Sequence, residues 1–290
     1  MSQPVDSNSR SKLSASQVAA HKGGNPLVML ALYDVQHARI AEAAGVDMIL
    51  VGDSVGMAVL GLDSTLQVTL DNIIYHARAV RRGAPNTHIT GDLPFMTYQV
   101  SDEQAVANAG KLVAKAGVDS VKLEGGVAMA SRIAAITQVG IPVVAHIGLL
   151  PQTATVQGGF KVQGKDVATA KQLLEDASAV TEAGAFAVVV ELVGAQLASR
   201  ITNAVAVPTI GIGAGVHCDG QVLVAPDLLG MDDRFQPRFL KKYADLHGTI
   251  LSAFSSYAND VRTRSYPDDE HSFKTPAATV DSLDGTLTNP

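Results

Sequence analysis

Short apolar runs alternate with longer amphipathic stretches along most of this chain. Each run is rich in β-branched residues and ends in glycine or a polar residue, and the stretch after it is rich in alanine and charge. The runs predict strands at Leu27–Leu32, Met48–Val51, His88–Gly91, Ser120–Leu123, Val143–Ala145, Phe186–Val190, Thr209–Ile212 and Val222–Ala225. The stretches between them predict helices that include Val35–Ala44, Thr69–Arg82, Asp102–Ala116, Val127–Gln138, Asp166–Ala183 and Ala195–Asn203.

These runs lack the alternation of apolar and polar residues that is typical of a sheet with one solvent-exposed face. They are typical of parallel strands that helices cover on both sides. Eight strand–helix units in roughly 250 residues predict a single α/β domain, a (β/α)8 TIM barrel. A doubly wound open sheet is the alternative, but it requires a glycine-rich turn after the first strand, where Leu32-Tyr-Asp-Val35 stands. We expect the last amphipathic segment, about Pro237 to Arg262, to form a terminal helix packed outside the barrel.

The composition limits the classes of partner that this protein is expected to bind. Of the 290 residues, 47% are hydrophobic and 17% charged, and the formal net charge is -6, which disfavours nucleic acid. Cys218 is the one cysteine, and no apolar run reaches the roughly 18 residues of a membrane helix, so we expect a cytoplasmic protein without a membrane partner. Residues 13–273 are the expected catalytic barrel, and the polar segments 1–12 and 274–290 are expected to be disordered.

Polar residues stand where the predicted strands end, and the active sites of such barrels lie at that end. They are Asp53, Ser54, Asp92, Lys122, Glu124, His146 and Glu191. A single aspartate after a strand often only caps the next helix. Several charges between apolar flanks, however, would cost several kcal/mol if they were buried unpaired. They therefore either pair with one another or hold a cation and a charged ligand, and their convergence favours a functional site.

The residue types indicate a chemistry. Asp53, Asp92 and Glu124 offer hard oxygen ligands, which suit Mg²⁺ or a similar ion better than structural zinc. Such an ion could chelate a 2-oxo acid and stabilise an enolate. Lys122 faces the same way as Glu124 and could hold the substrate's carboxylate or the enolate oxygen. Glu191 follows a very apolar strand, a setting that suits a carboxyl group to proton transfer.

Two further segments remain open to two interpretations. The loop from Leu149 to Gly164 is long and glycine-bearing, and is either a lid or a plain connection. Gly211-Ile-Gly-Ala-Gly215 follows the seventh predicted strand, where barrels often bind phosphate, but turn geometry alone could explain its glycines.

The chain also resembles the ketopantoate hydroxymethyltransferase (3-methyl-2-oxobutanoate hydroxymethyltransferase) family between about Leu27 and Phe273. The matching segments are Val51-Gly-Asp-Ser-Val-Gly56, Gly61-Leu-Asp-Ser-Thr-Leu66, Ala79-Val-Arg-Arg-Gly-Ala-Pro85, Asp92-Leu-Pro-Phe-Met96, Val121-Lys-Leu-Glu-Gly-Gly126, Ala145-His-Ile-Gly-Leu149, Gly158-Gly-Phe-Lys-Val-Gln-Gly164, Ile210-Gly-Ile-Gly-Ala-Gly215, Asp219-Gly-Gln221, Tyr266-Pro267 and Glu270-His-Ser-Phe273. The segment Ala31-Leu-Tyr-Asp34 departs from the family, which usually has a threonine and an alanine before the tyrosine.

The resemblance implies a TIM barrel of the phosphoenolpyruvate and pyruvate-processing kind, a Mg²⁺-type ion and a large homo-oligomer, commonly a decamer. It implies transfer of a hydroxymethyl group from 5,10-methylenetetrahydrofolate to 3-methyl-2-oxobutanoate, which gives 2-dehydropantoate for pantothenate and coenzyme A biosynthesis. The residue roles that it implies are as follows: metal ligands Asp53, Asp92 and Glu124; substrate-binding residues Asp53, Ser54, Asp92 and Lys122; and proton acceptor Glu191. His146 fits the family's pocket without an assigned role.

Two other functions compete with this interpretation. A metal-dependent lyase or mutase on a related barrel would also bind a 2-oxo acid through a divalent ion, but would lack the Gly158–Gly164 match and would not use folate. A barrel that only binds a ligand would have no chemical reason to keep all five of the charged residues Asp53, Asp92, Lys122, Glu124 and Glu191.

Overall fold

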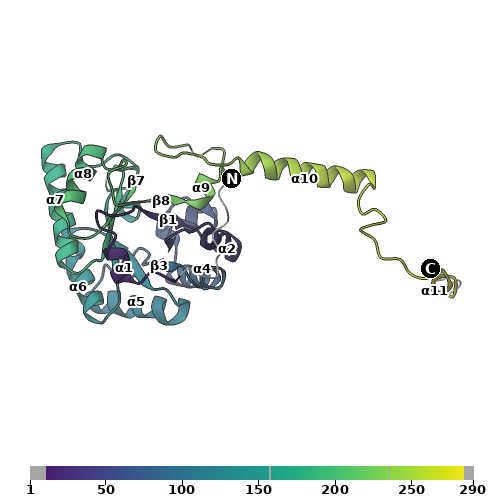
Figure 1. Ribbon diagram of the computed structural model, residues 1–290, viewed down its shortest axis with the longest axis horizontal. Coiled ribbons are helices and arrows are strands. Elements are labelled where there is room, and N and C mark those ends of the chain that lie inside the picture. The colour runs from purple at the N-terminus through teal and green to yellow at the C-terminus, as the bar shows by residue number, and fades with distance from the viewer. Residues whose placement is uncertain (1–10, 157, 235, 284–290) are drawn as a thin grey trace.

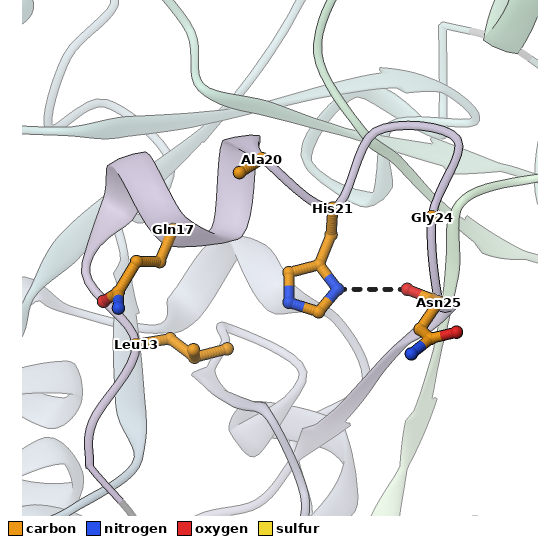
Figure 2. Close-up of a pocket in the computed structure, with 6 residues that line it drawn as sticks. All are labelled: Leu13, Gln17, Ala20, His21, Gly24 and Asn25. Carbon is orange, nitrogen blue, oxygen red and sulfur yellow. Dashed lines mark hydrogen bonds between the residues drawn. The ribbon is translucent and has the colours of Figure 1, made fainter.

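A computed structural model of the chain describes residues 11–156, 158–234 and 236–283. Eight parallel strands close into a barrel in chain order, with β8 paired to β1 (Figure 1). The strands are β1 Leu27–Ala31, β2 Met48–Val51, β3 His88–Asp92, β4 Ser120–Glu124, β5 Val143–Gly148, β6 Ala187–Glu191, β7 Thr209–Ile212 and β8 Gly220–Val224. The predicted single barrel is confirmed, and the closure between β8 and β1 excludes the open sheet.

Helices cover most of the outside of the barrel (Figure 1). The covering helices are α2 Val35–Ala43, α4 Leu70–Gly83, α5 Asp102–Ala116, α6 Ala130–Gln138, α7 Val167–Glu182 and α8 Ala195–Ala204. Their apolar faces pack on the strands; in α5, for example, Ala105, Ala109 and Leu112 are fully buried. Its start is fixed by Ser101, whose hydroxyl accepts a hydrogen bond from the Gln104 N–H, and it ends at left-handed Gly117.

Shorter helical segments occupy the loops. They are α1 Ala15–Ala19, α3 Val55–Ala58, η1 Thr65–Gln67, η2 Val127–Met129, η3 Pro151–Thr153, α9 Ala225–Leu228 and α11 Ala277–Asp281. The inside of the barrel is filled by a separate apolar cluster that includes Met29, Met48, Val144, Val189 and Val222. This packing leaves the carboxyl ends of the strands, the mouth of the barrel, as the place where polar side chains converge.

The helical layer is incomplete beside β7, β8 and β1. Residues 213–219, which connect β7 to β8, form turns and bends and no helix. The helix directly after β8 is the one-turn α9. On the outer face of β1, Val28 is 50% exposed, whereas every residue of β3, β4 and β5 is buried. One side of this barrel therefore lacks the helix that covers the others.

The helix that follows is α10, Leu246–Thr263, and none of its residues is buried. It extends away from the barrel (Figure 1), so the prediction that it packs on the outside is wrong. Backbone hydrogen bonds from Tyr243 N to Leu228 O and from Leu246 N to Leu229 O fix its start beside α9. The amphipathic pattern established that one face of this helix is suited to burial, but not which surface buries it.

The predicted disordered ends lie partly outside the described residues, namely 1–10 and 284–290. Within the predicted C-terminal tail, the structure has the short helix α11. No helix in the described ranges is both long and apolar enough to cross a bilayer.

Candidate active site

The structure brings the predicted site residues together at the mouth of the barrel. Asp53 and Ser54 follow β2, Asp92 ends β3, Lys122 and Glu124 lie on β4, His146 lies on β5, and Glu191 ends β6. Strand register places Asp92 opposite Lys122 and Glu124 opposite His146. Of the charged residues, only Glu191 is partly exposed, with 17% of its side chain accessible, while the others are buried.

The charged groups form a continuous series of contacts. The Lys122 ammonium lies 3.0 Å from Asp92 Oδ1 and 3.7 Å from Glu124 Oε1. His146 links the series to the sixth strand, because its Nδ1 lies 3.5 Å from Glu124 Oε1 and its Nε2 lies 3.2 Å from Glu191 Oε2. His146 Nδ1 also lies 3.3 Å from the Lys122 nitrogen. Four carboxylates thus surround one ammonium and one imidazole, so the cluster carries an excess of negative charge.

Burial and neighbouring charges shift the pKa values in different directions. Burial, then the Asp92 and Glu124 carboxylates, raise the pKa of Asp53 well above its usual value. Burial also raises the pKa of Glu124, but the His146 hydrogen bond and the Lys122 charge outweigh it, so the net shift is downward. Burial lowers the pKa of Lys122, yet the carboxylates of Asp92 and Glu124 more than offset this and raise it above its usual value. Lys122 is therefore a permanent cation here.

The same competition acts on the histidine. Burial and the Lys122 charge lower the pKa of His146, whereas its contacts with Glu124 and Glu191 raise it, and the result is a pKa of about 9. His146 thus favours its protonated form more than a free imidazole does, with a carboxylate near each ring nitrogen. His146, which had no predicted role, joins the β4 charges to Glu191.

The oxygen atoms at the mouth fit a hard cation that keeps part of its own shell. Asp92 Oδ1 and Glu124 Oε1 are buried, and their charged contacts among the described residues are the Lys122 ammonium and, for Glu124, His146 Nδ1. In residues 11–156, 158–234 and 236–283, no three His, Cys, Asp or Glu side chains form a ready-made metal cage. Carboxylate oxygens with open positions suit Mg²⁺, which retains water and substrate oxygens.

Ser54 stands at the first turn of α3, but its hydroxyl does not cap that helix. It instead forms a 2.7 Å hydrogen bond with the Tyr33 hydroxyl. Tyr33 belongs to the segment that departs from the family pattern, and burial raises its pKa far above the usual value, so the hydroxyl stays protonated. The contact fixes the position of the Ser54 hydroxyl next to Asp53 in the chain.

Two residues that the sequence did not single out complete the mouth. Gln152, in η3, and Tyr98, in the loop after β3, are both buried and hydrogen-bonded to each other at 2.8 Å. Gln152 lies in the loop 149–164, whose root is buried at Leu149 and whose tip exposes Val156 and Phe160. A glutamine in a loop carries no charge and no periodic signal, so only proximity in the fold reveals it.

The glycines after β7 have a local explanation. Gly213 and Gly215 adopt φ values of 63° and 83°. A Cβ on Gly213 would come within 2.7 Å of Leu192, and one on Gly215 within 2.5 Å of Ala195. Turn geometry and close packing account for these two residues, and phosphate binding by the segment stays a prediction.

Comparison with known proteins places the chain in a family. A family model described as ketopantoate hydroxymethyltransferase matches residues 12–269. The chain belongs to the ketopantoate hydroxymethyltransferase family. Among curated members, the 3-methyl-2-oxobutanoate hydroxymethyltransferase of Syntrophus aciditrophicus is 52% identical over 87% of this chain and 93% of its own length. That of Bacillus subtilis is 51% identical over 90% and 94%. The family predicted from the sequence motifs is confirmed.

Solved structures share the fold at low sequence identity. A phosphoenolpyruvate phosphomutase from Streptomyces platensis is 18% identical with a TM-score of 0.58, and the match covers 94% of this chain and 96% of that one. A phosphonopyruvate hydrolase in complex with oxalate and Mg²⁺ is 13% identical with a TM-score of 0.58, over the same shares of the two chains. At these identities the likeness establishes the barrel alone, whereas the ketopantoate hydroxymethyltransferase family is established by sequence.

Proposed function

We propose that this chain is a 3-methyl-2-oxobutanoate hydroxymethyltransferase of pantothenate biosynthesis, with 5,10-methylenetetrahydrofolate as the one-carbon donor. The observation that carries this function is the 52% identity to a curated enzyme of that name over 93% of the enzyme's length. The geometry agrees with it, because every predicted charged site residue reaches one barrel mouth.

Three carboxylates would hold a divalent ion there. Asp53 and Asp92 are the proposed ligands, and Glu124 completes the set directly or through water. A bound ion would supply Lewis acidity to the 2-oxo group, which makes the C3 proton of the substrate easier to remove. Asp53 and Asp92 also line the pocket of the 2-oxo acid. Mg²⁺ is the ion in the phosphonopyruvate hydrolase of the same fold.

Lys122 and Ser54 are the proposed binders of the substrate's carboxylate. The ammonium of Lys122 already lies against Asp92 and Glu124, so it supplies a fixed positive charge to an anionic substrate and to the charge that develops on its 2-oxo oxygen.

A Schiff base between Lys122 and the substrate would need the neutral amine, which the raised pKa of Lys122 disfavours. We expect borohydride added with 3-methyl-2-oxobutanoate to leave Lys122 unmodified by mass spectrometry; a reduced adduct would contradict this role.

Glu191 is the proposed proton acceptor. It ends β6 at the edge of the cluster, where its carboxylate is partly accessible and in contact with His146 Nε2 at 3.2 Å. This contact orients the carboxylate. The proton on C3 passes to Glu191, and C3 then forms a bond to the methylene carbon of folate. The bonds from that carbon to the two folate nitrogens break in turn, and a water oxygen replaces the last nitrogen to give the hydroxymethyl group. The two nitrogens take up two protons, equal in number to the one removed from C3 and the one released by water, as tetrahydrofolate leaves.

Purified protein with 3-methyl-2-oxobutanoate, Mg²⁺ and 5,10-methylenetetrahydrofolate tests this function. We expect 2-dehydropantoate in the complete mixture and none when either substrate is omitted. A lyase or mutase would convert a 2-oxo acid without folate, and a barrel that only binds ligands would convert nothing. Either result would overturn the proposal.

We also propose that the working form is a homo-oligomer, a decamer as in the family. Leu251, Phe254, Tyr257 and Val261 are exposed along α10 at spacings of three, three and four residues, which places them on one face of the helix. The barrel lacks a covering helix beside β1 and β8. A second copy would bury the apolar face of α10.

A further inference from the structure

Each of the three proposed ion ligands has one carboxylate oxygen that accepts a hydrogen bond from a protein N–H group. The Asp53 N–H donates to Asp92 Oδ2 at 3.0 Å. The other two donors come from a single residue, because the Gln152 N–H donates to Glu124 Oε2 at 3.0 Å and its side-chain Nε2 donates to Asp53 Oδ2 at 2.9 Å. One uncharged residue thus contacts two of the three proposed ion ligands.

The orientation of the Gln152 side-chain amide is fully determined. Its Nε2 also donates to the Leu93 carbonyl at 3.0 Å, and a carbonyl only accepts. On the opposite side, Oε1 accepts from the Tyr98 hydroxyl at 2.8 Å and from Gln99 Nε2 at 3.1 Å. All the hydrogen-bonding capacity of this buried amide is therefore used, and a flipped amide would place its oxygen against two acceptors.

Tyr98 links Gln152 to the backbone of Glu124. Its hydroxyl lies 2.8 Å from Gln152 Oε1 and 3.0 Å from the Glu124 carbonyl, and it accepts from the Glu124 N–H at 3.2 Å. Asp53, Glu124 and Gln152 come from three separate segments of the chain, and these bonds fix their relative positions. Gln152 binds Oε2 of Glu124 and Oδ2 of Asp53, whereas Lys122 and His146 contact Oε1 of Glu124. The network therefore acts on the carboxylate oxygen of Glu124 that these two cations do not contact.

We infer that Gln152 is a positioning residue, which holds Asp53 and Glu124 so that their other oxygens face the ion and the substrate. The inference rests on the proposed function, because it concerns the ligands of the proposed ion. The bond to Glu124 comes from the backbone and would remain with either analogue, whereas the bond to Asp53 requires the glutamine side chain. Glutamate would set its carboxylate against that of Asp53, and a methionine side chain would fill the space but donate no hydrogen bond. Groups that orient metal ligands typically change metal affinity or activity about 10–100-fold when they are removed.

The test compares Gln152→Met with Gln99→Met. Both substitutions replace an amide by a thioether of similar length. In the described structure, however, the Gln99 side chain donates to Gln152 Oε1 and accepts from the Tyr98 N–H, and neither bond involves a proposed ion ligand. Mg²⁺ binding is measured by isothermal titration calorimetry on the full chain without substrate, alongside the melting temperature, kcat and KM. We expect Gln152→Met to weaken Mg²⁺ binding by about 10–100-fold, and to regain part of its kcat at saturating Mg²⁺. Gln99→Met should stay within about threefold of wild type, since it leaves both donated bonds intact.

A structural role alone would lower the melting temperature of Gln152→Met and leave its Mg²⁺ affinity within about twofold of wild type; that outcome overturns the inference. If Gln152→Met does not fold, Tyr98→Phe removes the hydroxyl that orients the amide and should weaken Mg²⁺ binding in the same direction. Unchanged affinity in Tyr98→Phe then counts against the positioning role. Wild-type protein that binds no Mg²⁺ would overturn the proposed ion site itself, and with it this inference.

Discussion

At the barrel mouth charged side chains lie in the interior, whereas along α10 apolar side chains lie in solvent. The buried charges are stabilised by one another: Lys122 contacts Asp92 and Glu124, and His146 contacts Glu124 and Glu191. On the apolar face of α10, the ring of Tyr257 contacts that of Tyr266, but both rings remain partly exposed, and Phe254 is 70% accessible. The charges of the mouth thus have buried partners within the chain, whereas the apolar face of α10 is left accessible.

The difference shows that burial alone does not separate function from structure. Both regions carry side chains in the environment that they disfavour. At the mouth, excess negative charge favours a cation and an anion-binding ammonium, so the arrangement indicates chemistry. On α10, a continuous apolar face indicates association. Substitutions at the mouth should therefore lower activity without lowering stability. Substitutions on the apolar face of α10 should instead change assembly and leave the barrel intact.

The largest expected effect is that of Asp53→Asn. Loss of an ion ligand should lower kcat/KM by roughly 10³-fold or more, since Lewis-acid stabilisation is worth several kcal/mol. Removing one negative charge from a buried cluster of four carboxylates should leave the melting temperature of the ion-free protein equal or higher. Steady-state kinetics and calorimetric melting check both parts. A variant with normal turnover in chelator-treated buffer would contradict the ion site.

Glu191→Gln should have the next largest effect. It keeps the size of the side chain and removes the proton acceptor, so kcat should fall by about 10²–10⁴-fold. Binding of the 2-oxo acid and of Mg²⁺ should change much less, because Asp53, Asp92 and Lys122 remain. Exchange of the substrate's C3 proton with deuterated water, measured without folate, isolates this step. Exchange at the wild-type rate would mean that another group removes the proton.

On α10, Phe254→Asp should change assembly and leave the barrel intact. The new charge lies in the apolar face, so the oligomer should dissociate toward smaller species, as measured by analytical ultracentrifugation. Ser256→Asp is the matched control, because a residue two positions away lies about 200° around the helix, on the opposite face. Identical sedimentation of the two variants would show that this face is not an interface.

The smallest expected effect is that of a substitution at Asp119, which directly precedes β4 at the end of the barrel opposite the mouth. Burial raises the pKa of Asp119, but hydrogen bonds from Lys12, the Ile89 N–H and Arg81 outweigh it, so its pKa lies below the usual value. Its stabilising contribution is present above about pH 4 and is lost as the pH falls through the lowered folded-state pKa. Asp119→Asn should cost about 1–2 kcal/mol at neutral pH.

That stability difference should shrink in melting curves recorded at successively lower pH, as the pH falls through the lowered folded-state pKa and wild-type Asp119 becomes protonated. Activity per folded molecule should be unchanged. If the stability difference between wild type and Asp119→Asn stays constant across this pH range, the charge of Asp119 does not stabilise this end of the barrel.

Predictions from the sequence succeeded wherever the signal was local. The strands β2 and β7 have the predicted bounds, because a short apolar run between polar residues specifies a buried strand. The fifth strand was predicted to end at Ala145 but continues to Gly148, since the polar His146 interrupts an apolar run without interrupting backbone pairing. The last strand begins at Gly220 and not at Val222, because its pairing with Leu27 is invisible in its own residue types.

The sequence by itself determined the barrel, the family and the side on which the carboxylates converge, because parallel strands bring their carboxyl ends to one edge whatever the loops do. Only the tertiary structure decided which groups touch: His146 against Glu191, Tyr33 against Ser54, and Gln152 between Asp53 and Glu124. It also decided the direction of α10. The physical reason is that periodicity records how each segment meets water, whereas these contacts depend on strand register and loop paths that join residues far apart in the chain.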